Sequence, residues 1–580
     1  MTTTPDFTLD SDPWWRNAVV YQIYPRSFAD SDGDGVGDLR GIIGRLGHLR
    51  RLGVDVIWLS PIYRSPQADN GYDISDYQAI DPLFGDLDAF DALLAAVHEQ
   101  GMKLMMDLVV NHTSDEHAWF AAARSSRDDP HRDWYWWRDP RPGHEPGTPG
   151  AEPNNWRSFF GGPAWGYDSA SGQYYLHLFD TKQPDLNWEN PEVRQAVYRM
   201  MGWWLDRGVD GFRMDVINLI SKNAALPDGV EGGDGLGDGS PFYSDGPRVH
   251  EFLHEMHETV FASRPGRFIT VGETPGVTVE EAQRYTDPGR GEVDMVFQFD
   301  HVDLGRGPAG KFDPAPIDLL AFKAIMDRWQ TGLARTGWNS LYLNNHDQPR
   351  SVSRFGDDVA AWRDSATAWA TVLHLHRGTP YVYQGEEIGM TNFPFQDIAQ
   401  FRDVESLNHY RISSQAGASP EAVLPGLAAH SRDNARTPVQ WDAGAEAGFT
   451  SGTPWIAVNP NYSWLNAAAQ VDDAGSVFQH YRRLIDLRHR DRILVDGVFH
   501  MLLPDHRQVY AFERRTAVRC IVVVANLSAQ PVEVVVPVRG MKLWFTNRDD
   551  HDIADPDSLT AIAESDELVL EPWEARVYDI

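Results

Sequence analysis

Eight short runs of apolar, β-prone residues recur between residues 19 and 387, and segments of helical length separate several of them. The runs span residues 19–28, 55–62, 103–110, 211–216, 268–273, 295–300, 341–347 and 379–387. None alternates apolar with polar residues, and near-continuous apolarity is typical of strands buried on both faces. Residues 87–100 stop at Gly101 and residues 191–205 start with Asn190-Pro191, which are helix-end signals. Eight strands alternating with helices predict an α/β fold, a (β/α)8 TIM barrel.

Two segments depart from this alternation. Residues 111–176 follow the third strand, are rich in Trp, Pro, Gly and Asp, and predict an irregular insertion domain. We expect most of its tryptophans to pack that domain rather than to form a ligand-stacking surface: Trp119, Trp134, Trp136, Trp137, Trp156 and Trp165. Residues 501–580 contain strands and turns without a helical period, which predicts a C-terminal antiparallel β-sandwich. Residues 1–110 and 177–500 then form the barrel.

The charge balance limits the classes of partner. The chain has 84 acidic and 51 basic residues, a formal net charge of −33, which disfavours nucleic-acid and membrane-surface partners and suggests an uncharged or cationic substrate. The single cysteine, Cys520, cannot form an intrachain disulfide. The N-terminus has no secretion-signal pattern, and no apolar run approaches the roughly 18–20 residues that span a bilayer. We expect a cytoplasmic protein, either a monomer or a homodimer.

Ionisable residues interrupt the apolar runs near their C-terminal ends, which is where TIM barrels place their chemistry. Arg213 and Asp215 end the fourth run, Glu273 ends the fifth, and His346 and Asp347 end the seventh. Neighbouring strands lie about 4.8 Å apart, so the carboxyl groups of Asp215 and Glu273 could lie about 5 Å apart. That separation is expected of a retaining glycosidase, whereas an inverting enzyme needs a wider gap for a water molecule.

Motifs in a fixed order carry a family resemblance. They are DLVVNH (107–112), QPDLNW (183–188), GFRMDVIN (211–218), VGET (271–274) and NNHDQPR (344–350), together with DNGYDISDY (69–77), YQGEEIGMTN (383–392) and SRDNARTPVQWD (431–442). The chain resembles the α-amylase superfamily of retaining glycoside hydrolases, and within it the oligo-1,6-glucosidase and α-glucosidase branch. The resemblance runs from about residue 14 to the C-terminus.

The resemblance implies a role for each matching residue. Asp215 would be the nucleophile, Glu273 the general acid/base, and Asp347 the residue that stabilises the transition state. Arg213 would orient Asp215 and keep it ionised by lowering its pKa, while the pKa of Glu273 would be raised so that it stays protonated. The residues implied to bind substrate are Asp69, Tyr72, His112, Phe179, Gln183, Arg213, Val216, His346 and Arg436.

The loop after the first strand is acidic. Its candidate metal ligands are Asp30, Asp32, Asp34, the Val36 carbonyl and Asp38. The spacing is similar to an EF-hand loop, but Gly41 stands where that loop needs a bidentate Glu, so a true EF-hand is not expected. The family resemblance implies a structural Ca²⁺ (or Mg²⁺) here and no organic cofactor.

Val216, directly after the implied nucleophile, is a residue that accompanies α-1,6 preference in this branch. The resemblance therefore implies an exo-acting α-glucosidase that releases glucose from isomaltose and related short α-glucosides. An α-1,4 preference stays open, as does transfer or isomerisation like that of trehalose synthases or sucrose isomerases. The loop after the sixth strand lacks the arginine-rich motif associated with sucrose isomerases. A non-catalytic interaction protein is the remote alternative, although all three acids are present.

Overall fold

The computed structural model of the protein describes residues 13–233, 235–264, 268–548 and 562–580; residues 1–12, which bear on the expected absence of a secretion signal, lie outside these ranges. Eight parallel strands form the central sheet: β1 (Val20–Ile23), β2 (Val56–Leu59), β5 (Lys103–Leu108), β9 (Gly211–Met214), β12 (Ile269–Glu273), β13 (Met295–Phe297), β16 (Ser340–Leu341) and β17 (Thr379–Tyr383). Strand β1 pairs with both β2 and β17, and a bridge from Val296 to Asn339 closes the ring. The predicted (β/α)8 barrel is confirmed.

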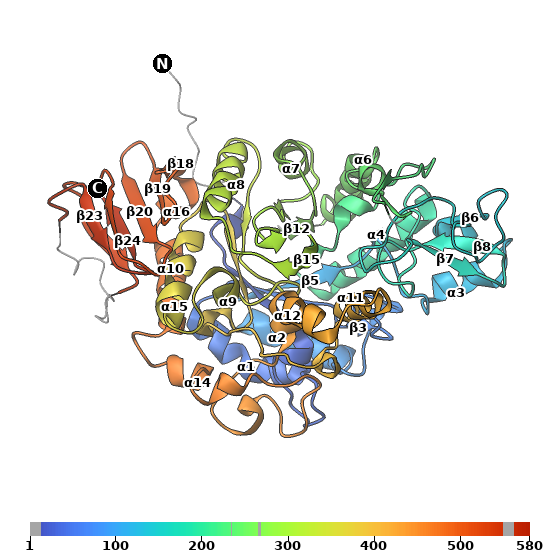
Figure 1. Ribbon diagram of the computed structural model, residues 1–580, viewed down its shortest axis with the longest axis horizontal. Coiled ribbons are helices and arrows are strands. Elements are labelled where there is room, and N and C mark those ends of the chain that lie inside the picture. Colours follow the sequence, from blue (N-terminus) through green and yellow to red (C-terminus); the bar gives the residue numbers. More distant parts are fainter. Residues whose placement is uncertain (1–12, 234, 265–267, 549–561) are drawn as a thin grey trace, which may run out of the picture.

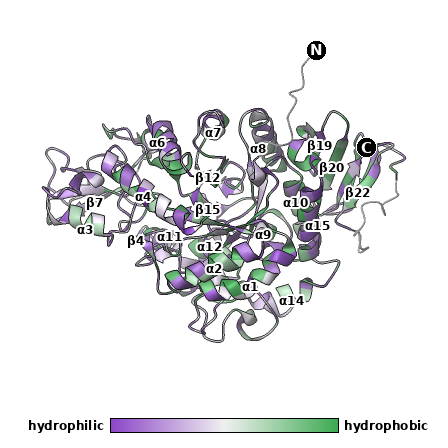
Figure 2. Ribbon diagram, turned by 180° about the vertical axis from the view of Figure 1, so that it is seen from behind, coloured by the Kyte–Doolittle hydropathy of each residue, from purple (hydrophilic) through white to green (hydrophobic). Residues whose placement is uncertain are grey.

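Helices surround the barrel (Figure 1). The main ones are α1 (Leu39–Leu52), α2 (Leu87–Glu99), α4 (Pro191–Arg207), α6 (Val249–Met256), α7 (Val279–Thr286), α8 (Leu319–Gly332), α10 (Trp362–His374) and α15 (Val477–Arg490). The predicted helix signals are present: the Asn190 side chain accepts the Glu192 N–H at 2.9 Å, and Gly101 follows the end of α2 with φ 79°. Helices α1 and α2 carry both hydrophilic and hydrophobic residues in Figure 2, as expected for helices with one face in solvent.

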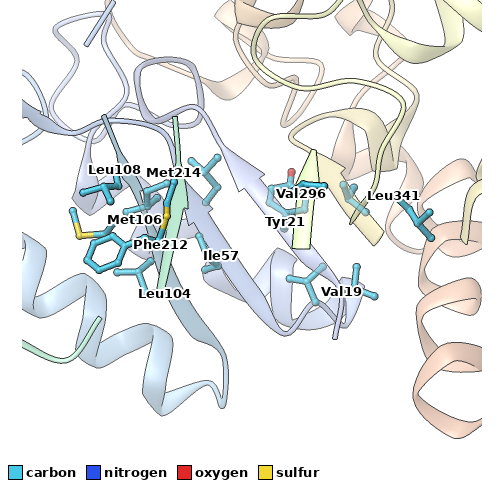
Figure 3. Packing of buried hydrophobic residues seen from close by; sticks show 14 of the residues in the cluster. Val19, Tyr21, Ile57, Leu104, Met106, Leu108, Phe212, Met214, Val296 and Leu341 are labelled. Atoms are coloured by element: carbon cyan, nitrogen blue, oxygen red, sulfur yellow. The ribbon is translucent and has the colours of Figure 1, made fainter. Parts of the chain in front are cut away.

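The barrel strands are buried on both faces, as their continuous apolar runs predicted. Leu104 and Met106 of β5 belong to the layer between the strands and the helices, part of which is drawn in Figure 3. Met105, between them in sequence, points the other way and packs inside the barrel with Trp58 and Val271. This alternation gives each strand a firm register, so the residues at the strand ends are held at fixed positions.

The insertion after β5 is more ordered than expected. It contains helix α3 (Ala118–Ser125) and a three-stranded antiparallel sheet of β6 (Trp137–Arg138), β8 (Gln173–Leu176) and β7 (Trp165–Asp168), far from the C-terminal sheet in Figure 1. Five of the six tryptophans considered above are buried, and Trp119 is half-buried, so the packing prediction is confirmed. Trp156 and Trp165 pack in one cluster with Val216, which connects the insertion to the loop after β9.

The C-terminal region consists of two antiparallel sheets. One contains β18 (Val498–Leu502), β19 (Val509–Arg515), β20 (Cys520–Asn526), β24 (Ala575–Asp579) and β22 (Lys542–Thr546); the other contains β21 (Val532–Val535) and β23 (Glu567–Leu570). Apolar residues of both sheets pack together, which confirms the predicted sandwich; its first strand begins at Val498. Within the described ranges, no helix is both long and apolar enough to cross a membrane.

Candidate active site

A cavity of about 280 Å³ opens at the end of the barrel where the strands terminate. Nine of the twelve predicted catalytic and substrate-binding residues line it: Asp69, Tyr72, His112, Phe179, Gln183, Asp215, Val216, Glu273 and Asp347. The other three, Arg213, His346 and Arg436, are buried behind its wall and are not among the described residues that line it. The volume is near the lower end of small-molecule pockets, about 300 Å³.

The two candidate catalytic acids leave neighbouring strands at the same level. Met214 of β9 pairs with Gly272 of β12, so the next residue on each strand is Asp215 and Glu273 respectively. Their side chains are only 9% and 6% exposed. The backbone N–H of Val216 donates to Glu273 Oε2 at 3.1 Å, which ties the end of one strand to the acid on the other.

One guanidinium group contacts both acids. Arg213 Nη1 lies 2.6 Å from Asp215 Oδ1 and 2.8 Å from Asp107 Oδ1, and Nη2 lies 2.7 Å from Glu273 Oε2. The carboxyl groups of Asp215 and Glu273 are therefore neighbours, in keeping with the roughly 5 Å separation of a retaining pair. Asp107 begins the DLVVNH motif, which carries no sign that this residue shares Arg213 with the other two acids.

Burial dominates the protonation of this cluster. It raises the pKa of Asp215 to about 7 and that of Glu273 to about 8, although Arg213 opposes both shifts. The expectation that Arg213 gives Asp215 a net lowered pKa is therefore wrong, because removal from water outweighs a cation shared by three carboxyl groups. The raised pKa expected for Glu273 is confirmed. This raised pKa suits Glu273 to hold a proton at neutral pH, as a general acid must.

Asp347, in contrast to Glu273, is held in its ionised form. Arg436 Nη2 donates to its Oδ1 at 2.8 Å, and Arg432 Nη1 lies 3.4 Å from the same atom. Burial works to raise the pKa of Asp347, but Arg432 and Arg436 hold it well below its usual range. Asp347 is thus a carboxylate that can accept hydrogen bonds from sugar hydroxyl groups throughout the neutral range.

Three further lining residues form a connected group beside Asp347. Gln183 Nε2 donates to Asp69 Oδ2 at 3.2 Å and also lies 3.2 Å from His112 Nε2. The remaining oxygen of Asp69 accepts from Arg432 Nη2 at 2.9 Å. The group offers fixed donors and acceptors on one side of the cavity, which suits recognition of a polyhydroxylated ring.

The site prediction did not single out the rest of the cavity lining. Its additional lining residues are Phe159, Phe160, Pro275, Phe299, Asp303, Arg306, Lys311, Gln348, Glu405 and Arg432. Most lie in segments that carry no recognised pattern. The exceptions are Gln348, in the NNHDQPR motif, and Arg432, which lies in the same SRDNARTPVQWD motif as Arg436, one helical turn earlier.

The acidic loop after β1 brings together three of its predicted metal ligands. Carboxylate oxygens of Asp30, Asp32 and Asp38 lie within 4.8 Å of one another. Asp34 is not part of this group, and its Oδ1 accepts the Val36 N–H at 2.8 Å. Three clustered carboxylates fit the oxygen ligands that Ca²⁺ and Mg²⁺ prefer. The three aspartates are not among the described residues that line the cavity, so an ion here would have a structural role.

Comparisons with known proteins agree with this geometry. The family model "Alpha amylase, catalytic domain" matches residues 22–497, and "Maltogenic Amylase, C-terminal domain" matches residues 499–576. The chain is 52% identical to an oligo-1,6-glucosidase of Parageobacillus thermoglucosidasius over 98% of this chain and 99% of that protein. It is 50% identical to a trehalose-6-phosphate hydrolase of Bacillus subtilis (strain 168), over 91% and 92% of the two chains. The crystal structure of isomaltulose synthase from Erwinia rhapontici NX5 superposes with a TM-score of 0.91 at 41% identity, covering 98% and 99%. The chain belongs to the α-amylase family and is a glycoside hydrolase.

Proposed function

We propose that the protein is a retaining, exo-acting α-glucosidase that releases glucose from the non-reducing ends of short α-glucosides and favours α-1,6 links. The observation that carries the proposal is the pair of buried acids at the ends of β9 and β12, which share one guanidinium at the wall of a small cavity. In the proposed complex, one sugar ring binds in that cavity with its anomeric carbon between the two carboxyl groups.

The two acids divide the work according to their proton affinity. The Asp215 carboxylate attacks the anomeric carbon while Glu273 gives its proton to the leaving oxygen, so the glycosidic bond breaks and a glucosyl ester forms. Glu273, now ionised, takes a proton from water, whose oxygen displaces Asp215 and releases glucose with its configuration retained. Asp347 accepts hydrogen bonds from ring hydroxyl groups as charge develops at the anomeric carbon.

The linkage preference rests on Val216 and on the relatives. Val216 lines the cavity with φ 34° and ψ 43°, a left-handed conformation that a β-branched residue rarely adopts. The packing of the insertion domain fixes this side chain beside the acids. Several relatives at about half identity are named oligo-1,6-glucosidases, which supports an α-1,6 preference.

The charges of the cavity favour an unphosphorylated substrate, although one relative is a trehalose-6-phosphate hydrolase. Lys311, a lining residue, pairs with Glu405, and Arg306 lies 2.7 Å from Asp303. The cationic lining residues are Arg306, Lys311 and Arg432, and the acidic ones are Asp69, Asp215, Glu273, Asp303, Asp347 and Glu405. Even with Glu273 protonated, five other acids face three cations, and an excess of acids disfavours a phosphate group.

Product analysis tests the proposal. The purified protein is incubated with isomaltose, maltose, sucrose, trehalose and trehalose 6-phosphate at low and high concentration, and NMR records the anomer first released. We expect α-glucose from isomaltose, slower release from maltose and none from trehalose 6-phosphate. A new disaccharide from sucrose or maltose would instead support transfer or isomerisation. Asp215→Asn is the inactive control, and Val216→Thr should change the isomaltose-to-maltose ratio by up to roughly 200-fold.

We further propose that Asp30, Asp32 and Asp38 hold a structural Ca²⁺ (or Mg²⁺) when the ion is present. The experiment is thermal denaturation with and without a chelator. We expect the chelator to lower the melting temperature of the wild type and to have no further effect on Asp32→Asn. A cytoplasmic location and a monomeric or homodimeric state belong to the same proposal, and the buried free thiol of Cys520 supports the location.

A further inference from the structure

Gln22 lies in β1, far in sequence from the acids, and the mechanism above does not use it. Its side chain is buried, with the residue 1% exposed. Its amide nitrogen Nε2 lies 2.8 Å from Nδ1 of His346 and 3.2 Å from the Ser60 hydroxyl. A buried amide beside a histidine ring determines which ring nitrogen carries the proton.

His346 has aromatic rings stacked on it and polar groups near both of its ring nitrogens. Tyr72, a cavity-lining residue, stacks on the ring at 5.0 Å and 7°. Tyr24 stacks at 6.4 Å and 12°. The ring nitrogen Nε2 lies 3.4 Å from Asp347 Oδ2. His346 therefore connects Gln22 to a wall residue and to a candidate catalytic acid.

The charges around His346 keep it neutral. The charged groups that act on it are Asp347, Arg213, Arg432 and Arg436, and the rings packed against it are Tyr24, Tyr72 and Trp58. Burial has the largest effect and lowers the pKa of His346 to about 3; Asp347 opposes this shift, and the three arginines add to it. A neutral imidazole has one N–H, so its neighbours select one of two tautomers.

Both neighbours select the same tautomer. The amide nitrogen of Gln22 only donates, so Nδ1 must be the acceptor and Nε2 must carry the hydrogen. Asp347 Oδ2, which only accepts, lies 3.4 Å from Nε2 and favours the same assignment. The opposite tautomer would place a lone pair against the Asp347 carboxylate.

We propose that Gln22 is a positioning residue, which holds His346 in the Nε2–H tautomer and thereby fixes the carboxylate of Asp347 and the ring of Tyr72. This inference rests on the proposed function, because it gives Asp347 a role in the reaction. Gln22 reaches the substrate only through these two side chains.

The test is Gln22→Glu, which keeps the shape of the side chain and replaces the donor with a titratable acid. In this variant His346 lies between two carboxyl groups. For Nδ1 and Nε2 both to stay paired as in the wild type, either the introduced acid or the imidazole must carry one additional proton. As pH rises this proton is lost. We expect kcat/KM on isomaltose to fall roughly 10- to 100-fold from low to high pH, over a range in which the wild-type profile does not fall.

Two further variants separate positioning from stability. Gln330 of α8 is also buried, and its two amide atoms bond the backbone of Arg377 at 2.9 Å each. Gln330→Glu should lower the melting temperature and leave the shape of the pH profile unchanged. Gln22→Leu, which cannot titrate, should lower kcat/KM without any new pH dependence and with the larger effect in kcat.

The outcomes are distinguishable. A wild-type protein inactive on every α-glucoside contradicts the proposed function itself. An active wild type whose Gln22→Glu variant keeps the wild-type pH profile, or whose Gln22→Leu variant keeps the wild-type kcat/KM, overturns the positioning role. If Gln22→Glu does not fold, the kcat/KM of Gln22→Leu decides.

Discussion

Replacement of Arg213 by Met removes a cation that Asp107, Asp215 and Glu273 share. The side chain is 1% exposed, and its Nη atoms lie 2.6 to 2.8 Å from one oxygen of each acid. Met occupies a similar volume without charge, so the substitution tests electrostatics with little change in packing. We expect all three acids to bind protons more tightly.

The size of the effect follows from Coulomb's law. Two unit charges about 4 Å apart interact by about 4 kcal/mol at an effective dielectric constant of about 20. One pKa unit corresponds to about 1.36 kcal/mol, so the loss of this interaction raises the pKa of Asp215 by about 3 units. From a starting pKa of about 7, about half of Asp215 is ionised at pH 7 in the wild type. In the variant the ionised fraction falls to about one in a thousand, which lowers kcat/KM roughly 500-fold at that pH.

The assay is the pH profile of kcat/KM on isomaltose, which reports the ionisation of the free enzyme. We expect the acidic limb of the Arg213→Met profile to move upward by about 2 to 3 pH units and much of the activity to return near pH 10. Arg213→Lys keeps the charge but cannot span both acids. The acidic limb of its pH profile should therefore stay within about one pH unit of the wild-type limb. An unmoved limb in Arg213→Met, with activity reduced equally at all pH values, would refute the electrostatic reasoning.

Three other predictions concern stability and leaving-group chemistry. Gly44 and Gly47 lie in α1 with open space where a Cβ would be added, so Ala at each should raise the free energy of unfolding by about 0.5–1 kcal/mol in denaturant titrations. Glu273→Gln should lose activity on isomaltose but keep most of its first step on an aryl glucoside, whose leaving group needs no proton; equal losses would contradict the acid role. Lys222→Met should destabilise the fold by about 3–5 kcal/mol, because it leaves the buried carboxylate of Asp185 unpaired. The Lys222→Met/Asp185→Asn double variant should recover most of that loss in the same titrations.

The sequence predicts those parts of the fold that depend on neighbours along the chain. Apolar runs such as 103–110 identify strands because both faces of each strand are buried, and the Asn190-Pro191 pair marks the start of α4. Strand ends likewise identify Asp215 and Glu273. The order inside the insertion was not predicted, because its short strands β6, β7 and β8 carry no long periodic pattern.

The net pKa of Asp215 could not be predicted for a related reason. The sequence gives the nearby Arg213, two residues away, but not the depth of burial or the two other acids that compete for the same cation. Both are properties of the closed barrel. Inference from a neighbouring charge alone therefore gave the wrong sign, whereas Glu273, for which burial and repulsion act together, was predicted correctly.

Contacts between distant segments account for what the motifs missed at the site. Arg432 pairs with Asp69, and Gln22 with His346, across most of the length of the chain. A motif identifies a residue at the rim of the barrel, but the partner of that residue is determined only when the barrel closes. These groups are buried, so each would lose a hydrogen bond that water cannot replace if its partner were removed. The residues behind the cavity wall should therefore affect the reaction mainly by fixing the orientation of the side chains that touch the sugar.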